Sequence, residues 1–484
     1  MGIVVNQSFK NTITTYLGFA FGAINTLLLY PFFLTDEYYG LLGYLLSTSN
    51  ILMPLMAFGV HNTLIKYYSS YTTPKEQQRF TTMMFVLPLL IIIPIGIIGT
   101  MAYENIVAFL SKENTIVTDY VWMIYVVAIA MAYFEVFFAW AKVHMRSVYG
   151  NFLKEVFHRV ASMVLIFLIF LKWITVQEFI LLSVFMYIAR MLLMLFSAVR
   201  IKLPKFQNSL PINYKSVLGY SALIILAGSI AIVLLDIDKF MIGQYIAIEN
   251  VAFYNVAVFI AVVITVPARA MHQITYPLTA KLINEHNSVA LQDLYKRSSL
   301  NLYVIGGGIF LLIVLNSNEL YNLLPAQYND AVLVVFIISI AKLTDMLLGN
   351  NNSILFNSKY YKMILLFGLL LAGITIVFNM IFIPRWGING AAIATLIGFL
   401  TYNTLKILYV YIKFNMHPFT RETLKTTAVI IGFVLLFFFW DFSFHPIVNI
   451  TLKSGIIAIG YMMAIYRISL SKDIVAIINK YIKR

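Results

Sequence analysis

The sequence predicts an all-α polytopic membrane protein with about 14 transmembrane helices. Fourteen stretches are long and apolar enough to cross a bilayer, whose hydrocarbon core of ~30 Å needs about 20 apolar residues in a helix. The composition agrees, since 61% of the 484 residues are hydrophobic and 11% are charged, against roughly 25% charged residues in soluble domains. Lysine and arginine are concentrated in alternate loops, which is typical of a chain that crosses the membrane many times.

The predicted spans follow one another along almost the whole chain. The outer loops are short, such as TDEYYG (35–40) and PRWGIN (384–389), so no loop is long enough to fold as a catalytic domain. Gly18 and Gly22 form a GxxxG pattern in the first span, which is typical of close helix packing. In order, the spans are 12–34, 41–60, 82–103, 119–140, 155–171, 179–199, 215–235, 250–272, 298–315, 329–349, 362–383, 390–411, 425–440 and 448–466.

The distribution of basic residues orients the chain. By the positive-inside rule, both termini are predicted to be cytoplasmic. This distribution also explains the net charge of +14 without a nucleic-acid partner. The chain has no cysteine, which excludes disulfides and thiolate chemistry. The N-terminus, the even-numbered loops and the C-terminal tail hold 24 of the 34 lysines and arginines, whereas the opposite side holds five, Lys112, Lys172, Lys239, Arg385 and Lys453.

A faint internal repeat predicts two six-helix lobes. MRSVYGNFL (145–153) and FNSKYYKMI (356–364) each join two spans, and Ser147 of the first matches Ser358 of the second. Repeated halves with a substrate site between them are common in transporters. We therefore expect an N-terminal six-helix lobe at 1–205, a C-terminal six-helix lobe at 206–415, helices 13 and 14 at 416–466 and a cytoplasmic amphipathic tail at 467–484.

Charged residues at membrane depth are the candidate functional residues. Each such charge costs at least ~2.5–3.5 kcal/mol on insertion scales, so it should face a partner or a water-filled cavity. Basic side chains outnumber acidic ones in the spans, and this excess predicts an anionic substrate. The residues are Arg159, Arg190, Arg269, Lys342 and Lys406, with the carboxylates Glu135 and Asp345.

The depth of each arginine suggests its role. Arg190 lies deep and Arg269 follows the kinking Pro267, so both are predicted to line a cationic substrate-binding cavity. Arg159 lies near the cytoplasmic end of its span, where cavity lining and snorkelling to the membrane surface both remain open. Lys406 is also near an inner end and is predicted to snorkel.

Two further positions carry open alternatives. Lys342 and Asp345 are spaced i,i+3 and can meet on one helical face, either as a structural pair or as part of the substrate and proton sites. Glu135 has no basic residue within a turn on its own helix. It is the best candidate for ion coupling, the alternative being a pair with an arginine of another helix. Lys342 joins the predicted cationic cavity, and Asp345 joins Glu135 as a predicted ion-coupling residue.

Enzyme motifs are missing from the sequence. It contains no GxxxxGK[ST], the motif that binds nucleotide phosphates, and no GxSxG, the nucleophile motif of hydrolases. Its seven histidines never pair at metal-ligand spacing. We therefore expect no enzyme activity, no catalytic residue, no cofactor and no metal site.

Three segments together resemble the polysaccharide transporter family of the multidrug/oligosaccharidyl-lipid/polysaccharide exporter superfamily. Residues 8–42 look like the family's opening span and its turn ending in Tyr-Gly-Leu. DIDKFMIGQYIAIENVAFYNVA (236–257) resembles the hairpin between its seventh and eighth spans. IPRWGINGAAIATLIG (383–398) is similar to its turn between spans eleven and twelve. The resemblance extends over about 8–466.

The resemblance implies a flippase. Its expected substrate is a polyprenyl-diphosphate-linked oligosaccharide, moved by alternating access from the cytoplasmic to the periplasmic leaflet of a bacterial inner membrane. The product would feed O-antigen, capsule or exopolysaccharide synthesis, with membrane lipids, a polysaccharide polymerase and glycosyltransferases as partners. A diphosphate headgroup would suit Arg159, Arg190, Arg269 and Lys342.

The chain departs from one pattern of the superfamily, and two alternative functions remain open. Lipid II flippases of the superfamily carry a basic residue in the first span, whereas here the strongly polar residue is Asn25, which disfavours a peptidoglycan precursor. A multidrug or cation antiporter of the same fold would use carboxylates such as Glu135. A membrane polysaccharide polymerase would need larger outer loops than this chain has.

Overall fold

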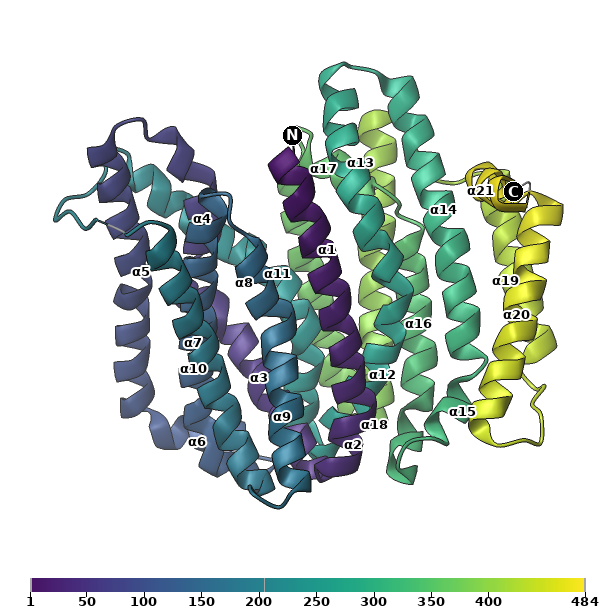
Figure 1. The fold of residues 1–484 in the computed structure, drawn as a ribbon, viewed down its shortest axis with the longest axis horizontal. Helices are drawn as coiled ribbons and strands as arrows, with labels where there is room; N and C mark the ends of the chain where they lie inside the picture. The colour runs from purple at the N-terminus through teal and green to yellow at the C-terminus, as the bar shows by residue number, and fades with distance from the viewer. Residues whose placement is uncertain (1, 204, 483–484) are drawn as a thin grey trace. The chain divides into compact units, whose positions relative to one another are not determined.

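The computed structural model describes residues 2–203 and 205–482, and in these ranges the chain is helical, without β-strands (Figure 1). It forms two compact units, Met1–Asn255 and Val256–Arg484. Helices cover each of the 14 predicted spans. The predicted lobe boundary at 205/206 follows from the internal repeat and stays a prediction. In the structure, α11 packs on α3 and α4 and therefore belongs to unit 1.

Unit 1 begins with the first span and ends within α12. Two of its segments are π-helical, Ile24–Leu29 and Leu153–Phe157. Its helices are α1 (Gly2–Ala23), α2 (Tyr30–Phe33), α3 (Asp36–Ala57), α4 (Val60–Tyr67), α5 (Pro74–Met101), α6 (Tyr103–Leu110), α7 (Val121–Val143), α8 (Val148–Phe152), α9 (His158–Phe170), α10 (Val176–Ile201), α11 (Tyr214–Tyr245) and the start of α12 (Glu249–Val262), with short 3₁₀ turns at Tyr68–Ser70 and Thr115–Tyr120.

Unit 2 holds the remaining helices. They are the rest of α12, α13 (Val266–Asn284), α14 (Ser288–Val314), α15 (Ser317–Tyr321), α16 (Val332–Met346), α17 (Asn351–Phe356), α18 (Lys362–Phe414), α19 (Arg421–Phe437), α20 (Pro446–Ile468) and α21 (Lys472–Ile482), with 3₁₀ turns at Val263–Thr265 and Ala326–Ala331. Among the described residues, nine helices are long and apolar enough to cross a membrane. The other predicted spans lie in α9, α11, α16, α19 and the second arm of α18.

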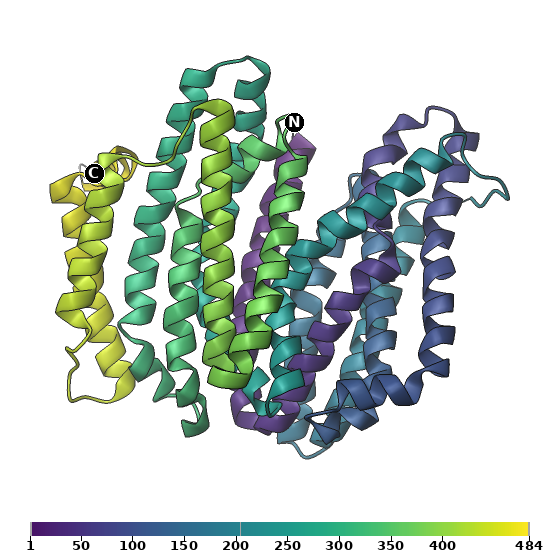
Figure 2. The ribbon, with the colours of Figure 1, turned by 180° about the vertical axis from the view of Figure 1, so that it is seen from behind.

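The 53 residues of α18 contain two predicted spans joined by a sharp turn. Gly387 has φ 56° and ψ −136°, a conformation open almost only to glycine. A Cβ on Gly390 would lie 2.2 Å from the carbonyl oxygen of Phe382, so a side chain there would block the turn. The two arms then run side by side, seen in green and yellow-green in Figure 2, with Gly398 against Leu371. The WGING sequence therefore specifies a helical hairpin.

Gly40, in the EYYGLLGY segment of α3, lets the turn between α11 and α12 approach closely. A Cβ on Gly40 would lie 2.0 Å from the carbonyl oxygen of Ile248, and one on Gly43 would lie 2.4 Å from the side-chain amide of Asn255. These two glycines thus allow α3 to pack closely on the turn before α12 and on the start of α12, within unit 1.

We expect Gly40→Ala to destabilise the protein by about 1–3 kcal/mol, because an overpacked contact forces backbone to move. Gly99→Ala in α5 is the matched control, since nothing lies within 4 Å of a Cβ there. The stability of the two purified variants in detergent is compared by thermal aggregation. An equal effect of the two substitutions would show that the α3 contact is not tight.

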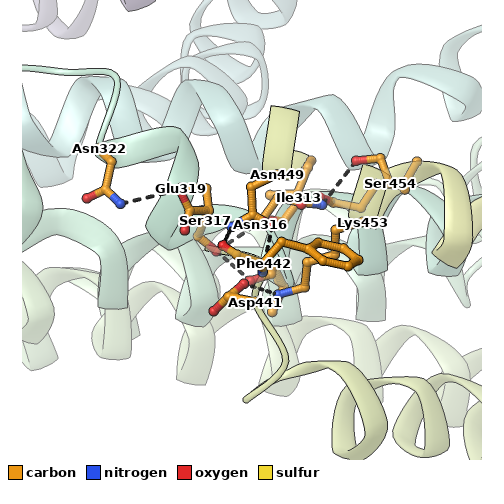
Figure 3. A network of polar contacts seen from close by, with 12 residues as sticks. Ile313, Asn316, Ser317, Glu319, Asn322, Asp441, Phe442, Asn449, Lys453 and Ser454 are labelled. Carbon is orange, nitrogen blue, oxygen red and sulfur yellow. Dashed lines mark hydrogen bonds and ion pairs between the residues drawn. The ribbon is translucent and has the colours of Figure 1, made fainter. Parts of the chain in front are cut away.

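Polar side chains close the loop end of the C-terminal helix pair (Figure 3). The Lys453 ammonium of α20, 2% exposed, lies 2.7 Å from Asp441 Oδ1 in the α19–α20 loop. Asn449 holds the same loop, donating to the carbonyl of Phe442 over 3.1 Å and accepting from its N–H over 3.2 Å. Asn316 Nδ2, at the start of α15, donates to Ser454 Oγ over 3.2 Å. These bonds tie α20 to the end of α14 and to its own loop.

The predicted amphipathic tail contains α21, which docks on unit 2. Arg297 of α14 holds Asp473 with two bonds, Nη2 to Oδ1 at 2.6 Å and Nε to Oδ2 at 3.1 Å. Asn301 Nδ2 donates to the same carboxylate over 2.8 Å. On the apolar face, Ile474 and Val475 pack on the core of the unit.

The Asp473 contact leads to a prediction about how docking of the tail depends on pH. The hydrogen bond from Arg297 holds the pKa of Asp473 below its usual 3.8. A depressed folded-state pKa means that the contact is complete above the unfolded pKa and is lost only as the pH falls through the folded value, so tail docking should not change between about pH 5 and 8. Asp473→Asn should speed hydrogen exchange in α21 by up to about fivefold, the range of an exposed ion pair. Lys480→Gln is the control, and unchanged exchange in Asp473→Asn would contradict the contact.

Candidate functional site

One group of charged side chains in unit 1 lies on α7 and on nearby helical segments, apart from the buried Asp236 and Asp238 of α11. α7 packs along α3, α4 and α10, and the π-helical segment 153–157 packs on α1 and α10. α7 carries Glu135, the π-helical segment carries Lys154 and Glu155, α9 carries Arg159, and α10 carries Arg190. With Lys142 near the end of α7, four cations face two carboxylates, so the cluster has an excess of two positive charges.

Arg190 is a buried cation that forms no hydrogen bond or salt bridge with the described residues. Its side chain is 8% exposed, and its guanidinium lies over the rings of Phe134 and Tyr187, 4.5 Å and 4.7 Å from their centroids. Its Nε has no hydrogen-bond partner among the described residues. Glu135 and Glu155 interact with it electrostatically, yet neither forms a salt bridge with it. Such a guanidinium has N–H groups left that can donate hydrogen bonds to an anion.

Arg159 lies in the groove of the GxxxG pattern of α1. A Cβ on Gly18 would lie 2.8 Å from Arg159 Nη1, and one on Gly22 would lie 3.0 Å from its Nε. The guanidinium is 3.4 Å from Glu155 Oε2, and Asn25 Nδ2 donates to the backbone carbonyl of Arg159 over 2.8 Å. The small residues of the first span therefore make room for an arginine, which is partly paired and 24% exposed.

Glu135 pairs with a lysine of the next helical segment. Its Oε1 lies 2.6 Å from Lys154 Nζ, with Glu135 13% and Lys154 43% exposed. Lys142 and His61 are further cationic or titratable neighbours. Sequence reasoning expected an arginine as the alternative partner and treated Lys154 as a loop residue. In the structure the partner is Lys154, because the π-helical segment Leu153–Phe157 extends α9 at its N-terminal end and brings Lys154 to Glu135.

Lys154 and Glu155 are the site residues that the sequence analysis missed. One available signal was symmetry, because Glu135 and Lys154 lie at similar distances on either side of the turn at 144–147. In a hairpin of antiparallel helices, such residues reach the same depth. The π-helical turn itself has no sequence signature, although such turns occur often at functional sites.

Unit 2 holds a second group of charges. Lys342 is 8% exposed, and its ammonium lies 4.2 Å from the ring centroid of Phe399. Asp345 interacts electrostatically with Lys406 and His272. Arg269, on α13, is exposed and has no salt bridge among the described residues. The structure thus brings Asp345 near Lys406.

The predicted snorkelling of Lys406 is wrong. Its side chain is fully buried at 0% exposure, its Nζ donates to Asn352 Oδ1 over 3.0 Å, and it lies 3.9 Å from the ring centroid of Tyr402. The ammonium of Lys406 is bonded to α17, so it is enclosed by the protein. Among the described residues, no group of three His, Cys, Asp or Glu side chains could hold a metal ion.

Comparison with known proteins identifies the fold. No protein-family model and no curated protein matches the sequence. Among solved structures, the lipid II flippase MurJ in an inward closed conformation matches 95% of this chain and 99% of its own, with 12% identity and a TM-score of 0.75. An inward-facing multidrug resistance MATE family transporter of the MOP superfamily matches 84% of this chain and 94% of its own, with 14% identity and a TM-score of 0.64.

These matches confirm the predicted fold class. The chain has the all-α transporter fold shared by MurJ and the MATE transporters, over nearly its whole length. The resemblance that the sequence predicts is confirmed for the fold. At 12–14% identity the likeness establishes the fold alone, because one fold carries many functions.

Proposed function

We propose that this chain is a flippase for polyprenyl-diphosphate-linked oligosaccharides. It would move the repeat units of a surface polysaccharide from the cytoplasmic to the periplasmic leaflet of a bacterial inner membrane by alternating access. Both termini would be cytoplasmic, as the basic loops predict. Its partners would be the lipid-linked oligosaccharide, membrane lipids and the enzymes that build and polymerise the unit.

The observation that carries the proposal is Arg190. A cation buried in a transporter fold and paired only with aromatic faces has a high cost unless a ligand shares its charge. A diphosphate supplies oxygens for the free guanidinium donors and matches their planar geometry. Arg159, half-paired with Glu155, is the second candidate in unit 1, and Arg269 and Lys342 are the candidates in unit 2.

A lipid II substrate is a second candidate, favoured by the position of Arg159. The first span has no basic residue, which argued against a peptidoglycan precursor. The guanidinium of Arg159 nevertheless lies against Gly18 and Gly22, so the surface of α1 does carry a cation, supplied by α9. The first-span sequence alone therefore does not separate the two diphosphate substrates.

A multidrug or cation antiporter has weaker support. The MATE neighbours share the fold, and Glu135 is a mostly buried carboxylate, 13% exposed. Its oxygen is already 2.6 Å from Lys154, and the surrounding cluster has a cationic excess. A cation would have to displace an ammonium in that environment, whereas an anion would be attracted to it.

The experiment is deletion of the gene in its host, followed by determination of the leaflet in which lipid-linked units accumulate. The proposal expects loss of surface polymer, with complete units trapped on the cytoplasmic leaflet and release by the wild-type gene. Units that reach the periplasmic leaflet without polymerising would contradict it and favour a polymerase. Accumulation of lipid II in place of the oligosaccharide would select the second candidate.

A further inference from the structure

A basic pocket lies in unit 1 at the ends of α1, α8 and α10, and its lining includes none of the charged residues of the Arg190 cluster. It has a volume of about 740 Å³, and its lining includes Lys10, Arg146 and Arg200. The remaining lining side chains are polar or apolar, and none is acidic. The apolar part of the lining includes Leu193 and Phe196 of α10.

Hydrogen bonds between α1 and the turn before α8 fix one wall of this pocket. The Gln7 side chain donates to the carbonyl of Met145 and accepts from Ser147 Oγ over 3.1 Å. Asn11 Nδ2 donates to Ser147 Oγ over 2.9 Å, and Asn151 Nδ2 donates to the carbonyl of Asn11 over 3.1 Å. Lys10 and Arg146 lie within this bonded segment, so both basic residues are held at the pocket by the fold.

The three cations have no acidic partner in the described part of the chain. No salt bridge there includes Lys10, Arg146 or Arg200. The Arg200 guanidinium lies 4.0 Å from the ring centroid of Phe196, which orients its flat fork. Three unpaired cations around one concave surface are an arrangement suited to phosphate oxygens.

The apolar side of the pocket indicates that the phosphate belongs to a lipid. Leu193 is 36% and Phe196 54% exposed, and both continue the outward apolar surface of α10, a helix long and apolar enough to cross the membrane. Basic pockets between transmembrane helices at the cytoplasmic side bind anionic lipid headgroups. A free phosphate ion would make no favourable contact with the apolar wall, whereas a lipid chain would.

We propose that this pocket binds the phosphate or diphosphate headgroup of an anionic lipid, with the first part of its chain along Leu193 and Phe196. The headgroup comes either from the transported polyprenyl diphosphate, held before translocation, or from a bulk phospholipid of the same leaflet. Only the assignment to the cytoplasmic leaflet rests on the proposed orientation. The binding itself would stand if the proposed function failed.

Native mass spectrometry of the full-length protein in detergent tests the proposal. The probes are geranylgeranyl diphosphate, phosphatidylglycerol and, as a zwitterionic reference, phosphatidylcholine. Arg146→Gln/Arg200→Gln should weaken the binding of at least one anionic probe by about tenfold or more without changing phosphatidylcholine adducts. The control is Lys75→Gln/Arg421→Gln, which removes two exposed cations outside the pocket.

The outcomes separate the two lipid sources. Loss of diphosphate binding alone would assign the pocket to the transported lipid, and loss of phosphatidylglycerol binding would assign it to bulk phospholipid. Equal losses in the pocket and control variants, or no loss in either, would overturn the proposal. Because binding is measured without transport, a failed flippase assay leaves this result intact, and the reverse also holds.

Discussion

Arg190→Gln is expected to lower transport of a lipid-linked diphosphate by about tenfold to a hundredfold, the range of one or two charge-assisted hydrogen bonds. The variant should still fold, because Arg190 forms no hydrogen bond or salt bridge with the described residues, and the substitution removes mainly its contacts with the faces of Phe134 and Tyr187. The initial rate of translocation in proteoliposomes, at matched protein content, measures the effect.

Two further variants show whether the effect is specific to the guanidinium of Arg190. Arg190→Lys keeps the charge but loses the planar fork, so it should recover part of the rate. Arg421→Gln removes an exposed arginine of α19 and should transport like the wild type. If Arg190→Gln transported as fast as Arg421→Gln, Arg190 would not be part of the substrate site.

Glu135 and Lys154 should behave as one unit in stability measurements. Breaking a fully buried ion pair costs about 3–5 kcal/mol. Because Lys154 is 43% exposed, we expect about 2–3 kcal/mol for Glu135→Gln, and less for Lys154→Met. The double variant should recover most of the lost stability, since it leaves no unpaired charge. Thermal unfolding of the single and double variants in detergent gives the coupling free energy between the two side chains. Additive losses would contradict a direct pair.

The same double variant tests the proposed ion-coupling role of Glu135. A stable protein that no longer transports is the result that this role predicts. A stable protein with full transport would show that the pair is structural. Asp345, near Lys406 and His272 in unit 2, would then be the remaining coupling candidate.

The sequence was sufficient for the spans because hydropathy and loop charge depend on local composition. The 14 predicted stretches all became helices, and the IPRWGING turn became the hairpin at Gly387. Side-chain partners were less predictable. Each residue turns a helix by about 100°, so the π-helical segment 153–157 changes which face the following residues of α9 present. The contact of Arg159 with Gly18 depends on that rotation.

Lys406 shows the second limit of sequence reasoning. Its place near the end of a predicted span is visible in the sequence, but whether its ammonium reaches water depends on α17, which brings Asn352 within 3.0 Å. That helix of six residues follows a span and has no hydropathy signal of its own. To predict whether a charge is buried, one must know which helices surround it, and the sequence pattern does not show this.

Translocation in a reconstituted system tests the flippase proposal most directly. The protein is placed in liposomes with a fluorescent polyprenyl-diphosphate oligosaccharide, and an impermeant quencher reports on the outer leaflet. The proposal predicts that inner-leaflet substrate becomes accessible in wild-type vesicles, more slowly with Arg190→Gln, and that a labelled phosphatidylcholine does not move. Substrate no more accessible than in protein-free vesicles, or equal movement of both lipids, would contradict it.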